Sequence, residues 1–412
     1  MWQSGSNSTG RFVVAGNPGS RRVELFASAL AAAGLPPPRV VAWADLLARR
    51  ADLSDVVRAG DVVRLESPGR DFEVERSILA AGADEPDADD TVRRTYERAA
   101  RSAVDALKFD RGRILWPRQW YLGFRAVLRL VARQLNACPP HRLLNDVDDV
   151  GVMFDKRLCH ARLASAGVAV PRALGPVRNF EALTSRMRDA GWRRVFIKLA
   201  HESSGSGVVA YQSGGPGGAM RRAVTTVEMV REGGDLRLYN SRRLRTYTDG
   251  REIATLIDAL ARHRVHVEQW VPKAGIDGRT FDLRVVVIAG RARHAIARLS
   301  RSPITNLHLL NDRADPAPVR RRMGDDAWHA AMDACERAMA CFPRSLHGGV
   351  DLLITTDFRC HAVLEVNAFG DLLPGVLSDG LDTFGAEIEA VTGTRPDGVS
   401  APDAAPALEV AT

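Results

Sequence analysis

The most constraining feature of this 412-residue sequence is a pair of short apolar segments near its C-terminus that carry acidic side chains. They are Val350–Ile354 (VDLLI) and Val363–Asn367 (VLEVN), and the polar stretch between them predicts a β-hairpin. Because successive side chains of a strand point to opposite faces, Glu365 and Asn367 share a face, and Asp351 is expected opposite them. Two carboxylates and an amide oxygen suit Mg²⁺ or Mn²⁺, above all Mg²⁺ shared with phosphates. A half-exposed hairpin with a polar outer face is the alternative, and the hairpin alone leaves both open.

The net charge of +7 comes mostly from arginine. Arginine-rich proteins bind nucleic acid or grip phosphate groups bidentately. The basic residues here are scattered among acidic ones, without a stripe of basic and aromatic residues. The sequence therefore favours a protein that handles phosphate anions over one that binds nucleic acid directly.

The cysteines and the lengths of the apolar stretches indicate in which cellular compartment the protein is expected. The five cysteines are odd in number and form no Cys-x-x-Cys pair, which predicts free thiols in a reducing, cytoplasmic environment. We find no apolar stretch typical of a signal peptide, and none long enough to span a membrane, so no membrane partner is expected. The length predicts two or three domains.

Apolar segments alternate with helical ones near the N-terminus, which predicts a small parallel α/β domain. The expected strands are 11–16, 39–42 and 61–65, and the expected helices are 23–33 and 45–51. The first turn reads Gly-Asn-Pro-Gly rather than Gly-x-Gly-x-x-Gly, so NAD binding is not favoured. Residues 66–69 follow the third strand, where ligands gather in such sheets, but an ordinary Pro-Gly turn is the favoured interpretation.

The rest of the chain predicts a mixture of helices and hairpins. Residues 116–135 form an amphipathic helix with a basic face, and 149–166 a single strong helix. Further helices are expected at 180–190, 325–341 and from 382, and strands or hairpins at 195–199, 208–211, 265–271 and 280–300. The acidic segment 82–90 is predicted to be a solvated loop, and the Ala- and Pro-rich end beyond 393 a disordered tail.

A second chemistry-bearing pattern is a lysine on an apolar strand, followed by a loop of small residues. Lys198 ends the run VFIK, and Ser203–Gly207 reads SSGSG. A buried ammonium is costly unless it meets an anion, and small residues let backbone N–H groups approach a phosphate. Because the lysine precedes the glycines, the order excludes a P-loop and suggests a flexible lid over a nucleotide. An ordinary loop is the alternative.

A third pattern combines arginines with a carboxylate. Asp282 and Arg284 share a face of their strand, Arg298 lies on the returning strand, and Asn306 follows. Arginines beside a carboxylate and metal cluster suit a γ-phosphoryl group in transfer and an acyl phosphate, with surface ion pairing as the alternative. The strand end Glu268–Val271 could present backbone groups to an adenine edge.

In chain order, these patterns resemble the ATP-grasp superfamily, particularly carboxylate–amine ligases such as glutathione synthetases, D-alanine–D-alanine ligases and ribosomal-protein glutamate ligases. The matching residues, within about 145–390, are Lys156, Lys198, Glu268–Val271, Asp282, Arg284, Arg298, Asp351, Glu365 and Asn367. Each pattern is weak alone, and their order makes the match specific. The sequence departs from the family at Leu199-Ala200, where a proline often follows the second lysine, and in a long insertion at 221–260.

The resemblance implies an α/β fold of the α+β ATP-grasp type. A small parallel α/β pre-ATP-grasp domain is expected at 11–140, a lid or central subdomain at 141–272, and a C-terminal subdomain with the metal site at 273–392. The two α+β subdomains would enclose ATP, and 393–412 would be the tail.

The resemblance also implies roles for individual residues. Asp351, Glu365 and Asn367 would bind one or two Mg²⁺ ions, with Mn²⁺ as an alternative, and Arg284 and Arg298 would steady an acyl phosphate. Nucleotide contacts would come from Lys156, Lys198, Ser203, Ser204, Gly205, Ser206, Gly207, Glu268, Gln269, Trp270, Val271 and Asn306.

The implied function is an ATP-dependent ligase that activates a carboxylate as an acyl phosphate and joins it to an amine, releasing ADP and phosphate. Its partners would be ATP, a carboxylate substrate and an amine acceptor, either an amino acid or a peptide. A homodimer is left open, as are the substrate identities. An ATP-grasp kinase or phosphotransferase and a non-catalytic ATP-binding regulatory protein are the alternative functions.

Overall fold

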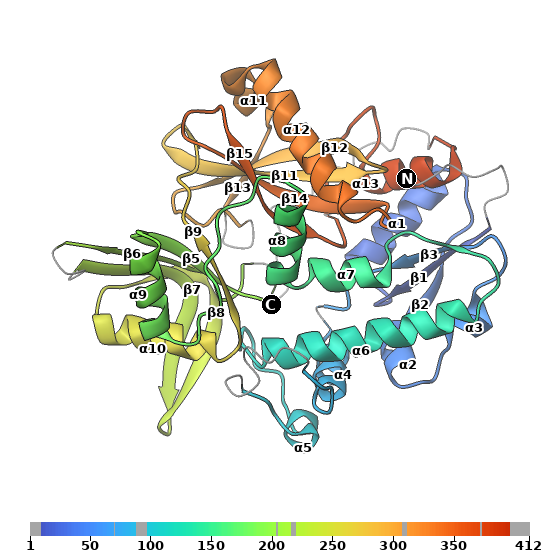
Figure 1. Ribbon diagram of the computed structural model, residues 1–412. Coiled ribbons are helices and arrows are strands. Elements are labelled where there is room, and N and C mark those ends of the chain that lie inside the picture. The colour runs from blue at the N-terminus through green and yellow to red at the C-terminus, as the bar shows by residue number, and fades with distance from the viewer. Residues whose placement is uncertain are drawn as a thin grey trace.

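The computed structural model describes residues 10–69, 71–87, 97–202, 205–215, 220–306, 311–370 and 373–395. It contains three sheets with helices packed around them (Figure 1). Within the described ranges, every helix is too short or too polar to cross a membrane. The predicted tail lies outside these ranges from residue 396 onward.

The N-terminal sheet is parallel, as predicted, with strand order β2-β1-β3-β4. Its strands are β1 (Phe12–Gly16), β2 (Arg39–Ala42), β3 (Val62–Leu65) and the short β4 (Arg142–Leu143), which the sequence did not predict. The helices of this region are α1 (Arg21–Ala32), α2 (Trp43–Leu47), α3 (Leu53–Val56), α4 (Phe72–Gly82), α5 (Arg101–Asp105) and α6 (Pro117–Asn136). The 20-residue α6 runs from this sheet toward the next one (Figure 1).

The second sheet is antiparallel, with strand order β8-β7-β6-β5-β9. Its elements are β5 (Arg194–Leu199), β6 (Val209–Gly214), β7 (Met220–Glu232), β8 (Asp235–Tyr247) and β9 (Val265–Gln269), with helices α9 (Phe180–Asp189) and α10 (Gly250–Ala261). The insertion at 221–260 therefore forms most of the long β7–β8 hairpin and nearly all of α10. These elements have their own apolar core, to which α9 contributes Leu183 and α10 contributes Leu256.

The third sheet, near the C-terminus, is also antiparallel, with strand order β13-β12-β11-β14-β15 and β10 paired to β11. Its strands are β10 (Gly275–Ile276), β11 (Arg279–Ile288), β12 (Arg291–Ser300), β13 (Asp312–Ala314), β14 (His347–Ile354) and β15 (His361–Asn367). Helices α11 (Ala317–Met323), α12 (Asp325–Ala340) and α13 (Thr383–Thr392) complete this region. The hairpin predicted from VDLLI and VLEVN is confirmed as β14–β15.

One prediction of secondary structure is wrong in detail. The single helix expected at 149–166 is two helices, α7 (Val147–Met153) and α8 (Lys156–Ser165). Asp155 breaks it, because its side chain accepts hydrogen bonds from the backbone N–H groups of Arg157 and Leu158 and so begins a new helix. This N-cap places Lys156 at the first position of α8.

A shared apolar core joins the N-terminal and C-terminal sheets. It runs from β1 through α6, α7 and α8 to strands β11 and β14, with Phe124 and Phe281 fully buried in it. The mixed α/β architecture predicted from the sequence is therefore confirmed.

Candidate active site

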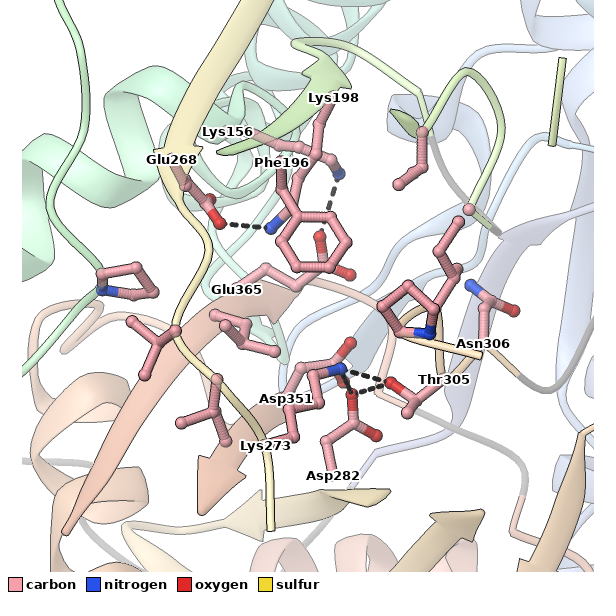
Figure 2. A pocket seen from close by; sticks show the side chains of 18 of the residues that line it. Lys156, Phe196, Lys198, Glu268, Lys273, Asp282, Thr305, Asn306, Asp351 and Glu365 are labelled. Carbon is pink, nitrogen blue, oxygen red and sulfur yellow. Dashed lines mark hydrogen bonds and ion pairs between the residues drawn. The ribbon is translucent and has the colours of Figure 1, made fainter. Parts of the chain in front are cut away.

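A cleft lies between the second and third sheets and encloses about 770 Å³, including open solvent at its mouth. Figure 2 shows how polar side chains from both sheets point into it. Eleven of the residues predicted for the site line it: Lys156, Lys198, Gly205, Ser206, Glu268, Gln269, Val271, Arg298, Asn306, Asp351 and Glu365. The structure thus brings together residues up to 209 positions apart in the sequence.

Both predicted lysines lie in the cleft, each paired with a carboxylate. Lys198 Nζ is 2.7 Å from Glu268 Oε2, and Lys156 Nζ is 3.0 Å from Glu365 Oε2 (Figure 2). Lys156 Nζ also donates to the Glu202 carbonyl at 2.9 Å. Burial would raise the pKa of Glu268, but the charges of Lys198 and His266 outweigh it and lower that pKa to about 2. The cleft therefore holds fixed, ionised groups of both signs.

The β14–β15 hairpin places the predicted metal ligands on adjacent strands. Asp351 pairs directly with Glu365 across the ladder, and Asn367 pairs with Gly349. Asn367 Nδ2 donates to the Gly349 carbonyl at 3.1 Å, which fixes the amide plane. Strand alternation predicted that Asp351 and Glu365 lie opposite each other, and their pairing on β14 and β15 confirms this arrangement.

This donor set fits a divalent cation that is shared with phosphates. Within the described ranges, no group of three or more His, Cys, Asp or Glu side chains is placed to hold a metal alone. Asp351 and Glu365 could supply two hard-oxygen ligands, and phosphate oxygens, waters or the Asn367 amide would complete the coordination, as is common at Mg²⁺ sites. Neither Asn367 nor Arg284 lines the cleft directly.

Two arginines form ion pairs with the carboxylates of Asp351 and Asp282. Arg284 Nε is 2.5 Å from Asp351 Oδ1, and Arg298 Nη2 is 2.9 Å from Asp351 Oδ2. Arg298 Nε also donates to Asp282 Oδ1 at 2.7 Å. Burial opposes the charge on Arg298, but its two carboxylate partners outweigh that effect and raise its pKa. Arg298 is thus a permanently charged, rigidly held guanidinium at the wall of the cleft.

Sequence reasoning missed Lys273, Thr305 and Phe196, which also line the cleft. Lys273 Nζ lies 2.9 Å from Asp282 Oδ2 and 2.5 Å from Thr305 Oγ1 (Figure 2). Burial would raise the pKa of Asp282, but Arg298 and Lys273 lower it to about 2. The sequence contains one signal for Lys273, its position two residues after the hinge, and no pattern indicated that it pairs with Asp282.

Two residues of the small-residue loop, Gly205 and Ser206, line the cleft. Gly207 has φ +67°, and a Cβ there would lie 2.2 Å from Leu199 Cδ1, so the position requires glycine. Gly205 has φ +72°, and a Cβ there would lie 3.0 Å from Asn306 Nδ2. Ser203 and Ser204 lie outside the described residues. Gly207 shapes the loop without lining the cleft.

The hinge differs in detail from the expectation. Gln269 and Val271 line the cleft, whereas Trp270 packs on Phe196 with ring centroids 5.1 Å apart. The backbone N–H groups of Gln269 and Trp270 donate to carbonyls of the protein at 2.8 and 3.2 Å. Those two amides are therefore engaged within the protein, and Phe196 lines the cleft where Trp270 does not.

Comparison with known proteins identifies the fold. Neither a protein-family model nor a curated protein matches the sequence. Among solved structures, D-cycloserine synthetase DcsG is 16% identical, with 92% of this chain and 97% of that chain covered and a TM-score of 0.51. The ADP complex of PurK, N5-carboxyaminoimidazole ribonucleotide synthetase, is 13% identical, with 93% and 78% covered and a TM-score of 0.51. The ATP-grasp ligase PsnB complexed with minimal precursor is 17% identical, with 94% and 100% covered and a TM-score of 0.48.

The similarity to the first two extends over nearly the whole of this chain. These similar structures are ATP-grasp ligases. The chain therefore has the ATP-grasp fold, as the resemblance drawn from its sequence implies.

Proposed function

We propose that this chain is an ATP-dependent carboxylate–amine ligase that uses Mg²⁺. One observation carries the proposal: a single cleft holds two lysines, two metal-capable carboxylates and a fixed arginine. These are the groups that a triphosphate, a divalent cation and a transferring phosphoryl group require. The ATP-grasp fold and the ADP complex of the similar PurK synthetase support the nucleotide role.

Nucleotide binding would exchange partners within the cleft. Lys156 and Lys198 are neutralised by Glu365 and Glu268 in this structure. A nucleotide with its cation brings both signs of charge, so the lysines can turn to phosphate oxygens while Glu365 turns to the cation. Mg²⁺, when bound, would offset phosphate charge between Asp351, Glu365 and Asn367. The exchange gives the lysines and Glu365 new partners of opposite charge, and Glu268 keeps its contact with His266.

The chemical step would depend mainly on positioning and charge. A substrate carboxylate attacks the γ-phosphorus, ADP leaves, and an amine then displaces phosphate from the acyl phosphate to form an amide. Arg298 is fixed by Asp282 and Asp351, so it can stabilise the phosphoryl charge with little reorganisation. Arg284 would act through Asp351, against which it is held.

We propose the same domain division as the sequence predicts, with the N-terminal unit at 11–140 and the two nucleotide-binding units at 141–272 and 273–392. The separate core around α9 and α10 supports a middle unit that can move relative to the rest. The five free cysteines support a cytoplasmic location. The acceptor would be an amino acid or a peptide.

Nucleotide product analysis tests the function. The chain is incubated with ATP, Mg²⁺ and pools of carboxylates and amines, and the products are separated by chromatography and mass spectrometry. We expect ADP and phosphate in equal amounts with an amide product. A product heavier by one phosphate would indicate a phosphotransferase, and tight ATP binding without turnover a regulatory protein. Either result would reject the ligase proposal.

A further inference from the structure

A buried ionic cluster lies behind the cleft and joins α6 to the nucleotide-binding loop. It consists of Asp87, Arg118, Asp155 and His201, whose side chains are 4%, 7%, 2% and 0% exposed. None of the four was singled out for the candidate site. Asp87 belongs to the acidic segment and Arg118 to the start of α6. Asp155 is the N-cap of α8, and His201 lies two residues before the small-residue loop.

Arg118 is the centre of the cluster. Its Nε and Nη2 donate to the two carboxylate oxygens of Asp87 at 3.0 and 2.5 Å, a bidentate pair. Its Nη1 lies 3.0 Å from His201 Nε2 and 3.8 Å from Asp155 Oδ2. One guanidinium therefore holds the acidic segment on one side and two residues of the nucleotide site on the other.

Asp155 links the two halves of the predicted phosphate site. Its Oδ1 caps α8, whose first residue is Lys156, and its Oδ2 lies 2.9 Å from His201 Nε2. The Lys156 backbone N–H also donates to the Ala200 carbonyl at 3.0 Å. The start of α8 and the start of the loop are thus fixed to each other through a side chain and through the backbone.

The proton on His201 follows from these contacts. Asp155 Oδ2 and Arg118 Nη1 both contact His201 Nε2. A carboxylate only accepts hydrogen bonds, so a proton on Nε2 serves the Asp155 contact, and the guanidinium, which only donates, then lies beside the ring without a hydrogen bond to that nitrogen. Burial lowers the pKa of His201, which keeps the ring neutral. Tyr121, one turn beyond Arg118 on α6, stacks on this ring with centroids 4.3 Å apart. The ring is therefore held at its edge and on one face.

The charges in the cluster leave it sensitive to the loss of Arg118. The guanidinium faces two buried carboxylates, and burial would raise the pKa of Asp155 if His201 and Arg118 did not lower it. Without Arg118, the two carboxylates would lose the cation that they share in a dry site, and the separate charges of Arg264 near Asp87 and Arg157 near Asp155 would remain. The segment around Asp155 and His201 would then shift, and Lys156 and the loop would shift with it.

We propose that Arg118, Asp155 and His201 are positioning residues that set Lys156 and residues 201–202 and 205–207 for the nucleotide phosphates, with Asp87 anchoring Arg118. This inference rests on the proposed nucleotide role of the cleft. Under this inference, α6 and Asp87 support the phosphate site. They have no part in recognition of the acceptor.

The test measures the dissociation constant of ADP by isothermal titration calorimetry, with Mg²⁺, for the full chain and five variants, of which Asp87→Asn removes the carboxylate charge that anchors Arg118. Arg118→Ala removes the centre, Arg118→Lys keeps only its charge, and His201→Phe keeps the stack on Tyr121 but lacks the N–H. The matched control is Arg129→Ala, which breaks an exposed ion pair between the same helix and the same segment, at Glu85. Thermal unfolding of each variant separates lost binding from lost structure.

We expect Arg118→Ala and His201→Phe to weaken ADP binding at least tenfold, Arg118→Lys to recover part of that loss, and Arg129→Ala to change it less than twofold. Once substrates are known, KM for ATP should rise in the first two variants while KM for the acceptor stays unchanged. If Arg118→Ala does not fold, His201→Phe and Asp87→Asn carry the same expectation.

Two results would overturn the inference, and they differ from failure of the proposed function. ADP binding unchanged in His201→Phe and Asp87→Asn, with wild-type binding intact, would reject the positioning role alone. A rise in acceptor KM with nucleotide binding unchanged would assign α6 to substrate selection instead. Wild-type protein that binds neither ADP nor ATP would reject the proposed function and this inference together.

Discussion

At the scale of single residues, the cleft is organised by charges that are already paired. Each ammonium or guanidinium facing the cleft has a carboxylate within ion-pair distance, as Lys198 has Glu268 and Arg298 has Asp351. A buried pair costs desolvation energy and is weak evidence for stability. Such pairs are better explained as a preorganised binding site. Its charged groups are held in place by internal partners until a nucleotide and a cation replace those partners.

Glu365→Gln tests this account at one residue. The amide keeps the shape but removes the negative charge that neutralises Lys156 and would bind the cation. We expect turnover to fall at least about 100-fold, equivalent to about 2.7 kcal/mol of transition-state stabilisation, with little change in melting temperature. Steady-state kinetics across Mg²⁺ concentrations and a thermal melt measure both quantities.

Asp333→Asn is the control for that substitution. It removes a carboxylate on α12 that pairs with Arg337 at an exposed position, so activity should remain within twofold. Full activity in Glu365→Gln at saturating Mg²⁺ would refute the metal assignment.

At the scale of elements, the β5–loop–β6 segment combines a rigid strand with a strained loop. β5 is hydrogen-bonded on both sides, to β6 and to β9, so Lys198 is firmly placed. The loop that follows turns through two glycines with positive φ and packs Gly207 against Leu199. A fixed lysine and a shaped loop together define where phosphates can bind.

Gly207→Ala should damage this loop. The new Cβ would clash with Leu199 and adopt a left-handed conformation, at a cost of about 1–3 kcal/mol from strain alone. We expect ADP binding to weaken more than tenfold and the melting temperature to fall by a few degrees. Calorimetric binding and a thermal melt provide the readouts.

Gly191→Ala separates strain from crowding. Gly191 has φ +69°, and a Cβ there would meet nothing within 4 Å. Its substitution should lower stability without changing ADP binding. Equal loss of binding in both variants would show that the loop contact with Leu199 is irrelevant to the site.

At the scale of the whole molecule, a second buried network fastens the N-terminal sheet to the C-terminal region. Arg64 on β3 contacts Glu387 on α13 and lies 2.6 Å from Glu66. Arg22 on α1 contacts Glu66 and the Phe369 carbonyl, two residues beyond Asn367. The N-terminal sheet therefore supports the segment that follows the predicted metal ligands.

This network predicts a pH dependence of stability. Burial raises the pKa of Glu387 to about 7, despite the opposing effect of Arg64. A carboxyl with a raised pKa gains a proton on folding, so its stabilising contribution is full below its ordinary pKa of 4.5 and is lost as pH rises through 7. The loss is on the order of 3 kcal/mol.

Glu387→Gln should remove this loss, because the amide cannot ionise. Denaturant unfolding at about pH 5 and pH 8 measures the difference for wild type and variant. The control is Glu389→Gln on the same helix, which breaks the Arg293 pair near the surface and should leave the wild-type dependence intact. An unchanged pH dependence in Glu387→Gln would contradict the burial argument.

Local patterns in the sequence were enough for part of this picture. Strand alternation predicted that Asp351 and Glu365 meet, and the lysine followed by small residues predicted the loop. Lys273 and Phe196 could not be found, because Phe196 lies on β5 and Lys273 between β9 and β10, and their place in the cleft depends on how the second and third sheets face each other. The α7–α8 break was missed because the capping role of Asp155 competes with an uninterrupted helical pattern. The roles of the site residues remain predictions.

The most direct test of the central claim follows oxygen from the carboxylate substrate. The carboxylate found by product analysis is labelled with ¹⁸O and incubated with the chain, ATP, Mg²⁺ and the amine, and the released phosphate is analysed by mass spectrometry. An acyl-phosphate route transfers one ¹⁸O atom to each phosphate, alongside one ADP and one amide. Unlabelled phosphate, or acceptor-dependent AMP in place of ADP, would contradict it.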